Sequence, residues 1–259
     1  MKIKHYIVTY NNNEVLNTSL ESIFNSLCNY SKDNYKVYII NNHSNFWIDY
    51  KFEPYVEVLH NVLRPDFSTG HLSRNWNQAI INGFVDLLNP DCDIVITSQN
   101  DCVFKDGFIE NLIELHKNYD LIQFGAGDNF ISYTPNSIIE VGLWDERFCN
   151  IGYQEADYFL RSILYNPNKT SINDTPHERT HNEIDNIIIT ESKTGYIREE
   201  PSHMSSLKYH TISENVYIEK WGDSPKHHIK NGWCYDNLKH LTPKIKYYMM
   251  YPYFEQNIK

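Results

Sequence analysis

The sequence predicts an α/β protein with a mostly parallel, mixed sheet flanked by helices, and three observations support this class. Short β-branched and aromatic runs alternate along the chain with helical stretches of about 10–15 residues. The first strand, the helix after it and the second strand have the combined length of a βαβ unit. Such a unit implies a parallel pair of strands and a right-handed crossover. Polar clusters follow three predicted strands, at residues 9–13, 41–44 and 98–102. Ligands of parallel sheets bind beyond the carboxyl ends of the strands, so these clusters mark a candidate site.

The predicted elements follow in order from the N-terminus. Residues 4–10 form a strand that stops at a run of asparagines. Leu16, Leu20 and Leu27 belong to an apolar stripe with helical spacing, and residues 35–40 form the second strand. The pattern then repeats, with strands expected at 56–59, 93–97 and 121–124 and helices at 73–88 and 107–117.

The alternation becomes less regular after residue 140. Residues 154–164 have helical spacing, whereas the charged segment 168–183 is interpreted as a loop or insertion. A short strand is a candidate at 187–189. We expect a single domain over residues 1–215, with a C-terminal extension over 216–259 packed on it.

The composition excludes several classes of protein. The chain has 259 residues, and 41% of them are hydrophobic, which supports a buried core and argues against bulk disorder. With 23 Lys+Arg against 33 Asp+Glu the formal net charge is −10, so we expect no nucleic-acid partner. No apolar run approaches the roughly 18 residues that a membrane-spanning helix needs. A strand follows Met1 almost at once and leaves no room for a signal peptide, so we expect a cytoplasmic protein.

Neither the cysteines nor the most zinc-like motif predicts a metal site. The five cysteines are scattered, and none forms a C-x-x-C pair, so we expect reduced structural thiols. Residues 177–181 read His-Glu-Arg-Thr-His, which matches a zinc-protease pattern literally. Pro176 precedes this motif and its flanks are polar, without an amphipathic helix, so a solvated loop is the preferred interpretation.

Asp101 is the first candidate for chemistry, because it directly follows the buried strand at 93–97 and the polar residues Ser98-Gln-Asn100. A hard divalent cation prefers carboxylate oxygens and leaves coordination positions open for phosphate and water. The simpler alternative is that Asp101 caps the turn that follows the strand.

A second candidate region lies between residues 141 and 161. It contains Gly-x-x-Asp-Glu-x-Phe at 142–148 and then Glu155 and Asp157 in the first turn of the predicted helix, where the helix dipole favours carboxylates. Structurally this is a capped amphipathic helix. Functionally, Glu155 could be a general base at the rim of a cleft, while Asp157 is expected either to cap the turn or to pair with Arg161 four residues later.

Six motifs in this order resemble those of inverting nucleotide-sugar glycosyltransferases of the GT-A fold, close to family 2, and the likeness covers residues 4–165. The motifs are Ile7-Val-Thr-Tyr-Asn11, Ile39-Ile-Asn-Asn-His-Ser44, Leu72-Ser-Arg-Asn-Trp-Asn-Gln-Ala79, Gln99-Asn-Asp101, Gly142–Glu146 and Gln154–Asp157. The resemblance implies a GT-A-like domain with a nucleotide-sugar half over 1–102 and an acceptor half over 103–215.

The resemblance also assigns a role to each motif. Glu155 would deprotonate the acceptor hydroxyl, and Asp101 together with the late His203 would hold Mn²⁺ or Mg²⁺, with His210 as the alternative to His203. Trp144 and Asp145 would line the acceptor side. The donor-binding residues would be Thr9, Tyr10, Asn11, Asn41, Asn42, Arg74, Asn75, Gln99 and Asn100. The partners would be a nucleotide-sugar donor and a carbohydrate or glycolipid acceptor.

Within these six motifs the sequence departs from the family pattern at four places. Asn41 replaces an aspartate that contacts the base or ribose, so the base preference stays open. Gln99 replaces the first aspartate of the metal motif, which leaves Asp101 as the carboxylate ligand there. Gln154-Glu155 replaces Glu-Asp, so the base would be a glutamate. Asn77 stands where glycine is common.

Two other functions stay open at this point. A nucleotidyltransferase would share strands, metal and nucleotide chemistry, but residues 9–13 lack its glycine-rich loop with a basic residue. A catalytically inactive carbohydrate- or nucleotide-binding relative is compatible with Gln99 and Asn41. The aromatic segment 244–254 with its basic flanks is either a packed terminal segment or a peripheral membrane contact.

Overall fold

The structure is a computed structural model. It describes residues 1–9, 12–27, 30–31, 33–43, 45–61, 72–125, 127–148, 152–174, 200–230, 234–235 and 241–242. The strands are β1 (Ile3–Thr9), β2 (Tyr35–Asn41), β3 (Val56–His60), β4 (Ile94–Gln99), β5 (Leu121–Gly125), β6 (Phe130–Tyr133), β7 (Thr170–Asp174), β8 (Ile229–Lys230) and β9 (Cys234–Tyr235). The helices are α1 (Asn13–Ser26), η1 (Glu53–Tyr55), α2 (Leu72–Phe84), α3 (Phe108–Leu115), α4 (Pro135–Val141), α5 (Tyr153–Tyr165), α6 (Glu200–Trp221) and α7 (Pro225–His228).

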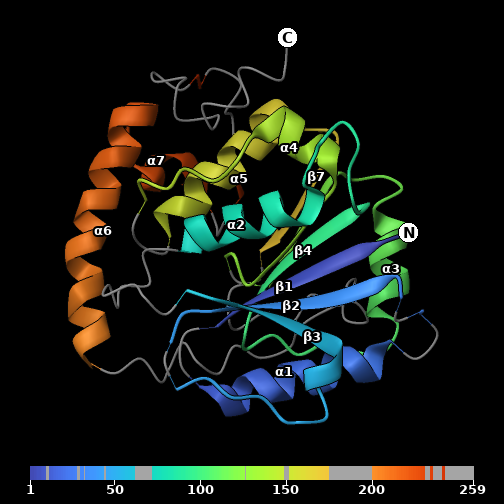
Figure 1. Ribbon diagram of the computed structural model, residues 1–259. Coiled ribbons are helices and arrows are strands. Elements are labelled where there is room, and N and C mark those ends of the chain that lie inside the picture. Colours follow the sequence, from blue (N-terminus) through green and yellow to red (C-terminus); the bar gives the residue numbers. More distant parts are fainter. Residues whose placement is uncertain are drawn as a thin grey trace.

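Seven strands form one twisted, mixed sheet in the order β3-β2-β1-β4-β6-β5-β7 (Figure 1). Strands β3, β2, β1 and β4 are parallel to one another, β6 runs antiparallel to both β4 and β5, and β7 is parallel to β5. This confirms the predicted α/β class with a mostly parallel, mixed sheet. Thr9 pairs with Asn41, and Val8 pairs with Gln99, so β1, β2 and β4 end at the same edge.

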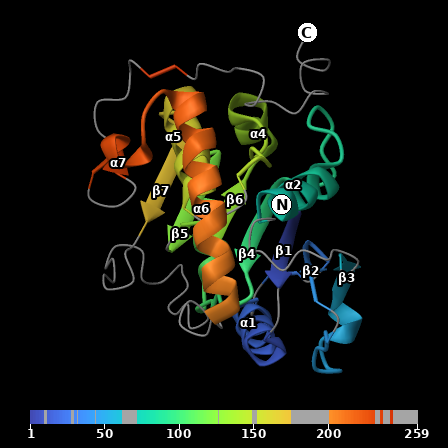
Figure 2. The same ribbon diagram turned by 90° about the vertical axis from the view of Figure 1, so that its left-hand side faces the viewer.

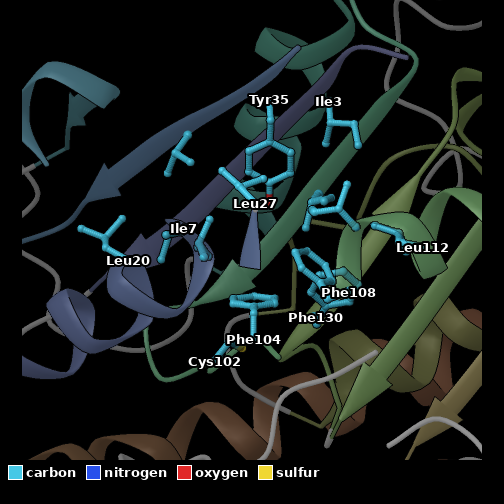
Figure 3. Packing of buried hydrophobic residues seen from close by; sticks show 14 of the residues in the cluster. Ile3, Ile7, Leu20, Leu27, Tyr35, Cys102, Phe104, Phe108, Leu112 and Phe130 are labelled. Carbon is cyan, nitrogen blue, oxygen red and sulfur yellow. The ribbon is translucent and has the colours of Figure 1, made fainter. Parts of the chain in front are cut away.

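Both faces of the sheet are covered by helices, because successive side chains of each strand point to opposite faces. Ile3 and Ile7 of β1 pack in one core cluster with α1 and α3, and Figure 3 shows the aromatic side chains at its centre. Tyr6 and Val8 of the same strand pack on the other face with α2, α4 and α5. Gly83 of α2 lies so close to β4 that an added Cβ would come within 2.3 Å of a Val95 methyl carbon.

Helix α6 is the largest element that the sequence did not reveal. It runs along the outside of α5 (Figure 2), where Tyr217 and Trp221 are buried with Tyr153 and Leu160 in a third core cluster. The expected boundary between residues 215 and 216 therefore falls inside a continuous helix whose last turns pack against the domain.

Other differences from the predicted elements have local causes. Helix α2 ends at Phe84 rather than residue 88, because Val85 adopts a left-handed conformation (φ 67°). Strand β6 was not expected, and Thr170–Asp174 is strand β7 rather than part of a loop because it pairs with β5. The candidate strand at 187–189 lies outside the described residues. No helix in the described part of the chain has both the length and the apolar character to span a bilayer.

Candidate functional site

Polar side chains from the ends of three strands meet at one edge of the sheet. We call Thr9, Asn41, Asn42 and Asn100 the strand-end cluster. The Asn100 side-chain amide donates to Thr9 Oγ1 (3.1 Å), and the Asn42 backbone N–H donates to the Thr9 carbonyl oxygen (3.0 Å). Thr9 and Asn41 are buried, as the pairing of their strands requires. The sequence therefore predicted correctly that these residues lie together.

Asn41 is fixed by both groups of its side-chain amide. Its Nδ2 donates to the His43 carbonyl oxygen (2.9 Å) and lies 3.0 Å from His60 Nδ1, while its Oδ1 accepts from the His43 backbone N–H (3.1 Å). The hydrogen bonds continue at the end of β3, where Asn61 contacts Asn75 of α2 (3.4 Å). Asn75 is thereby connected to the strand-end cluster through Asn61, whose backbone N–H donates to the Asn41 carbonyl oxygen (2.7 Å).

Gln99 and Asp101 lie in the turn that follows β4. Asp101 is 3% exposed, and Gln99 is partly exposed. Burial raises the pKa of the neighbouring Cys102 thiol well above its usual value, and the charges of Asp101 and Asp128 act in the same direction. Both carboxylates therefore lie close to this turn.

Asp128, in the turn between β5 and β6, is a buried carboxylate that the sequence analysis missed. Its Oδ1 accepts from Gln99 Nε2 (2.6 Å), and its Oδ2 accepts from Trp76 Nε1 (2.8 Å) and Gln154 Nε2 (2.9 Å). Gln154 also accepts from the Ser73 hydroxyl (2.8 Å). Asp128 thus joins the β4 turn to α2 and to the start of α5.

Glu155 follows Gln154 in α5 and faces the turn between β5 and β6. Its Oε2 accepts from the Gly152 backbone N–H, so the carboxylate caps its own helix, and the side chain is 1% exposed. An added Cβ at Gly127 would lie 3.2 Å from Glu155 Oε1, and Gly127 has a φ of +59°. Glycine is needed at 127 both for this conformation and for the approach of the carboxylate.

Helix α2 is attached to the 142–148 segment by Arg74 and Asn77. Arg74 Nε donates to Glu146 (3.0 Å), although the Arg74 side chain is about half exposed. Asn77 donates to the Trp144 carbonyl oxygen (2.9 Å) and accepts from the Trp144 backbone N–H (2.8 Å). The asparagine that stands in place of glycine therefore has a structural role in holding this loop.

The structure does not place Trp144 and Asp145 where a sugar ring could meet them. The Trp144 ring is 2% exposed and stacks on Tyr158, with the ring centroids 4.1 Å apart. Asp145 is 6% exposed and accepts from both Arg147 (2.7 Å) and Lys220 (3.0 Å). The expected acceptor-side positions are corrected to core positions, because the ring face and the carboxylate are already engaged by protein groups.

Asp145 belongs to a group that we call the buried ion cluster, composed of Asp145, Asp157, Arg161 and Lys220. Asp157 bonds to Arg161 (3.0 Å), as predicted, and also to Lys220 (2.8 Å) and Trp221 (2.8 Å). Burial opposes ionisation of Asp145, but Lys220 and Arg147 outweigh it and hold the pKa of that carboxyl below its usual value. Burial lowers the pKa of the Lys220 ammonium, against the attraction of Asp157 and Asp145.

Several predicted residues cannot be placed. Tyr10 and Asn11 lie outside the described residues, as do His177, His181 and the segment 244–254. His203 lies in α6, but its side chain is not described, and the exposed His210 packs edge-on against Tyr153. Within the described residues no three His, Cys, Asp or Glu side chains form a group that could hold a metal ion by themselves.

Comparison with known proteins gives structural matches only. No family model matches the chain, and no curated protein matches it. The chain is similar to the mannosyltransferase PcManGT from Pyrobaculum calidifontis, solved in complex with GDP-Man and Mn²⁺, with a TM-score of 0.54 and 11% identity over 87% of this chain. It is also similar to S. aureus TarS 1-349, with a TM-score of 0.45 and 13% identity over 66% of this chain.

The chain spans 66% of the length of the PcManGT structure and 58% of that of TarS 1-349. The likeness to PcManGT covers 87% of this chain, and at 11% identity it establishes the fold alone. Together with the strand order and the strand ends that meet at one edge, this likeness shows that the chain has a GT-A-like fold.

Proposed function

We propose that the protein transfers a sugar from a nucleoside-diphosphate donor to an acceptor hydroxyl, with inversion at the anomeric carbon. The observation that carries this proposal is the strand-end cluster at the carboxyl edge of a GT-A-like sheet, next to the turn that bears Asp101 and close to the start of α5. That PcManGT is complexed with GDP-Man and Mn²⁺ supports a donor and a cation of this kind.

The donor nucleoside would lie against the strand-end cluster. Amide and hydroxyl groups suit this role, because they can exchange internal hydrogen bonds for bonds to a base and ribose. Asn75 and the predicted Tyr10 and Asn11 would complete the contacts, and Arg74 would approach ribose or phosphate from the N-terminal turns of α2. Arg74 could turn from Glu146 toward the donor, because its side chain is about half exposed.

A divalent cation fits the oxygen ligands of the β4 turn. Asp101 would supply a carboxylate oxygen and Gln99 an amide oxygen, both hard ligands suited to Mn²⁺ or Mg²⁺, with His203 as a further ligand. Diphosphate oxygens would have to complete the shell, since two side chains of one turn do not form a cage. When bound, the ion would neutralise the negative charge of the departing nucleoside diphosphate.

Glu155 would accept the proton of the acceptor hydroxyl. The hydroxyl oxygen then forms its bond to the anomeric carbon while the bond from that carbon to the phosphate oxygen breaks, and the nucleoside diphosphate leaves with the electron pair. A single displacement inverts the anomeric configuration and needs no covalent enzyme intermediate. The Gly152 N–H, bonded to Oε2, would orient the carboxylate for this transfer.

The acceptor would be a carbohydrate or a glycolipid. A lipid-linked acceptor would give the segment 244–254 a use as a peripheral membrane contact of a cytoplasmic enzyme. A nucleotide-binding protein without turnover is the second candidate function, because the carboxylate of Glu155 is buried and already caps α5.

Nucleotide release from UDP-, GDP- and dTDP-sugars, measured with and without Mn²⁺, separates these functions. We expect release from at least one donor, dependence on Mn²⁺ and a strong loss in Asp101→Asn. Tight donor binding without release or transfer to any acceptor would favour the non-catalytic function. Release of a sugar 1-phosphate with transfer of the nucleoside monophosphate would contradict the proposal.

A further inference from the structure

Asp128 occupies a position that links the two sides of the proposed active site. The carboxylate is 1% exposed and accepts hydrogen bonds from three uncharged donors that belong to β4, α2 and α5. The adjacent Gly127 is the residue over which Glu155 packs. One turn therefore contacts both the cation side, through Gln99, and the helix that carries the proposed base.

The bonds to Asp128 fix which end of each glutamine amide points where. A carboxylate only accepts hydrogen bonds, so Gln99 and Gln154 must both turn their NH₂ groups toward it. The carbonyl oxygen of Gln154 then accepts from Ser73. In the described part of the chain the carbonyl oxygen of Gln99 accepts no hydrogen bond, and this side chain is partly exposed.

We propose that Asp128 is a positioning residue that holds the Gln99 amide with its carbonyl oxygen toward the diphosphate and cation of the donor. The inference rests on the proposed function. Without Asp128 the Gln99 amide could rotate and present its NH₂ group, which repels a cation. Asp128 would act only through Gln99 and Gln154 and would not touch the substrate.

The substitution Asp128→Asn tests this orientation with little change of volume. The introduced asparagine keeps one oxygen, which can accept from Trp76 and Gln154, but its NH₂ group then faces Gln99. The Gln99 amide must rotate to accept that hydrogen bond, and its NH₂ group replaces the carbonyl oxygen at the cation side. Adding Gln99→Glu should restore the oxygen at the cation side. One oxygen of the introduced carboxylate accepts from the NH₂ group of the introduced asparagine, and the other faces the proposed cation.

The experiment is calorimetric titration of UDP and of GDP, each with Mn²⁺, into the wild-type protein and its variants, with thermal unfolding in parallel. Asp128→Asn should weaken Mn²⁺-dependent binding by about 10–100-fold, the usual effect of losing the partner of a metal ligand. The double variant Gln99→Glu/Asp128→Asn should recover most of the affinity. Gln99→Glu alone should not bind better than wild type, because the introduced carboxylate would be a like charge in contact with Asp128.

Rescue distinguishes positioning from support of the fold. Equal loss of affinity in Asp128→Asn and in the double variant, or unchanged affinity in Asp128→Asn, would overturn the inference while leaving the proposed function intact. If Asp128→Asn does not fold, Gln99→Leu replaces it as the test, because Asp128 then keeps its bonds from Trp76 and Gln154. Unchanged nucleotide affinity in Gln99→Leu would also overturn the inference. If the wild-type protein binds neither nucleotide, the proposed function fails and this inference with it.

Discussion

The strand-end cluster and the buried ion cluster are held together by different chemistry. In the strand-end cluster, uncharged amides and a hydroxyl are joined by hydrogen bonds of 2.9–3.4 Å. In the buried ion cluster, charged groups that are at most 6% exposed lie 2.8–3.0 Å apart. Amides can exchange partners with a ligand at little cost, whereas a buried charge cannot lose its counter-ion without a large penalty. The amide partners of the strand-end cluster can thus be exchanged, whereas the helices beside the proposed base are fixed.

The largest expected effect separates the two acidic residues at the start of α5. Glu155→Gln should lower sugar transfer by about 10²–10⁴-fold with donor affinity close to wild type, because only the proton acceptor is lost. Asp157→Asn, a matched change two residues later, should mainly lower stability, because Asp157 bonds to Arg161, Lys220 and Trp221. Steady-state kinetics and thermal unfolding of both variants measure the two effects. Full turnover in Glu155→Gln with loss in a folded Asp157→Asn would reverse the assignment.

Removing Lys220, one of the two cationic side chains of the buried ion cluster, should have the largest effect on stability. Lys220→Met leaves two buried carboxylates with fewer counter-ions, and we expect the free energy of unfolding to fall by about 3 kcal/mol. Lys117→Met is the matched control, because Lys117 pairs with Glu114 on the surface, where ion pairs contribute little. Urea denaturation measures both. A similar, small change in the two variants would show that the cluster does not fix α6 to the domain.

These regions also show what the sequence could predict. The strand-end cluster followed from hydrophobic runs that end in polar residues, because strand pairing alone brings such ends together. Asp128 gave no signal, since it stands in a glycine-rich turn and its three donors come from distant parts of the chain. Trp144 was misjudged, and Lys220 was not singled out, for a related reason. Burial of such side chains depends on how α5 and α6 pack, which no local pattern records.

A pH titration of stability tests two buried histidines, His5 of β1 and His116 at the end of α3. His5 lies between Tyr35 (2.6 Å) and Ser98 (2.7 Å), and His116 contacts Ser132 (2.6 Å). Burial lowers the pKa of His5 to about 3 and that of His116 to about 4 from 6.5. From about pH 6.5 down to these lowered pKa values, the unfolded chain binds more protons than the folded one. The free energy of unfolding therefore falls as the pH is lowered through this range.

From pH 7 to pH 6 the two histidines together should reduce the free energy of unfolding by about 1.4 kcal/mol. Urea denaturation at several pH values measures the slope, and His116→Gln should make it shallower. A flat profile between pH 7 and 6 would mean that these imidazoles are not kept neutral in the folded protein. A loss confined to pH values below 4 would point instead to the carboxylates of the buried ion cluster.

The smallest expected effect concerns backbone strain away from both clusters. Val85 is 72% exposed and adopts a φ of 67°, which a β-branched residue tolerates poorly. Val85→Gly should raise the free energy of unfolding by about 0.5–1 kcal/mol, because relief of this strain exceeds the entropy that glycine adds to the unfolded chain. Leu88→Gly, at an exposed position of the same turn without a positive φ, should show no gain. Equal changes in both variants would remove the argument from strain.

The most direct test of the proposed donor site is a crystal structure with Mn²⁺ and a nucleoside diphosphate, UDP and GDP each being tried. We predict that the nucleoside lies against the strand-end cluster, and that the ion lies within bonding distance of Asp101 and of the diphosphate oxygens. Mn²⁺ without nucleotide should not occupy this position, since the diphosphate completes its shell. A nucleotide bound elsewhere, or an ion held by His177 and His181 instead of Asp101, would contradict the account.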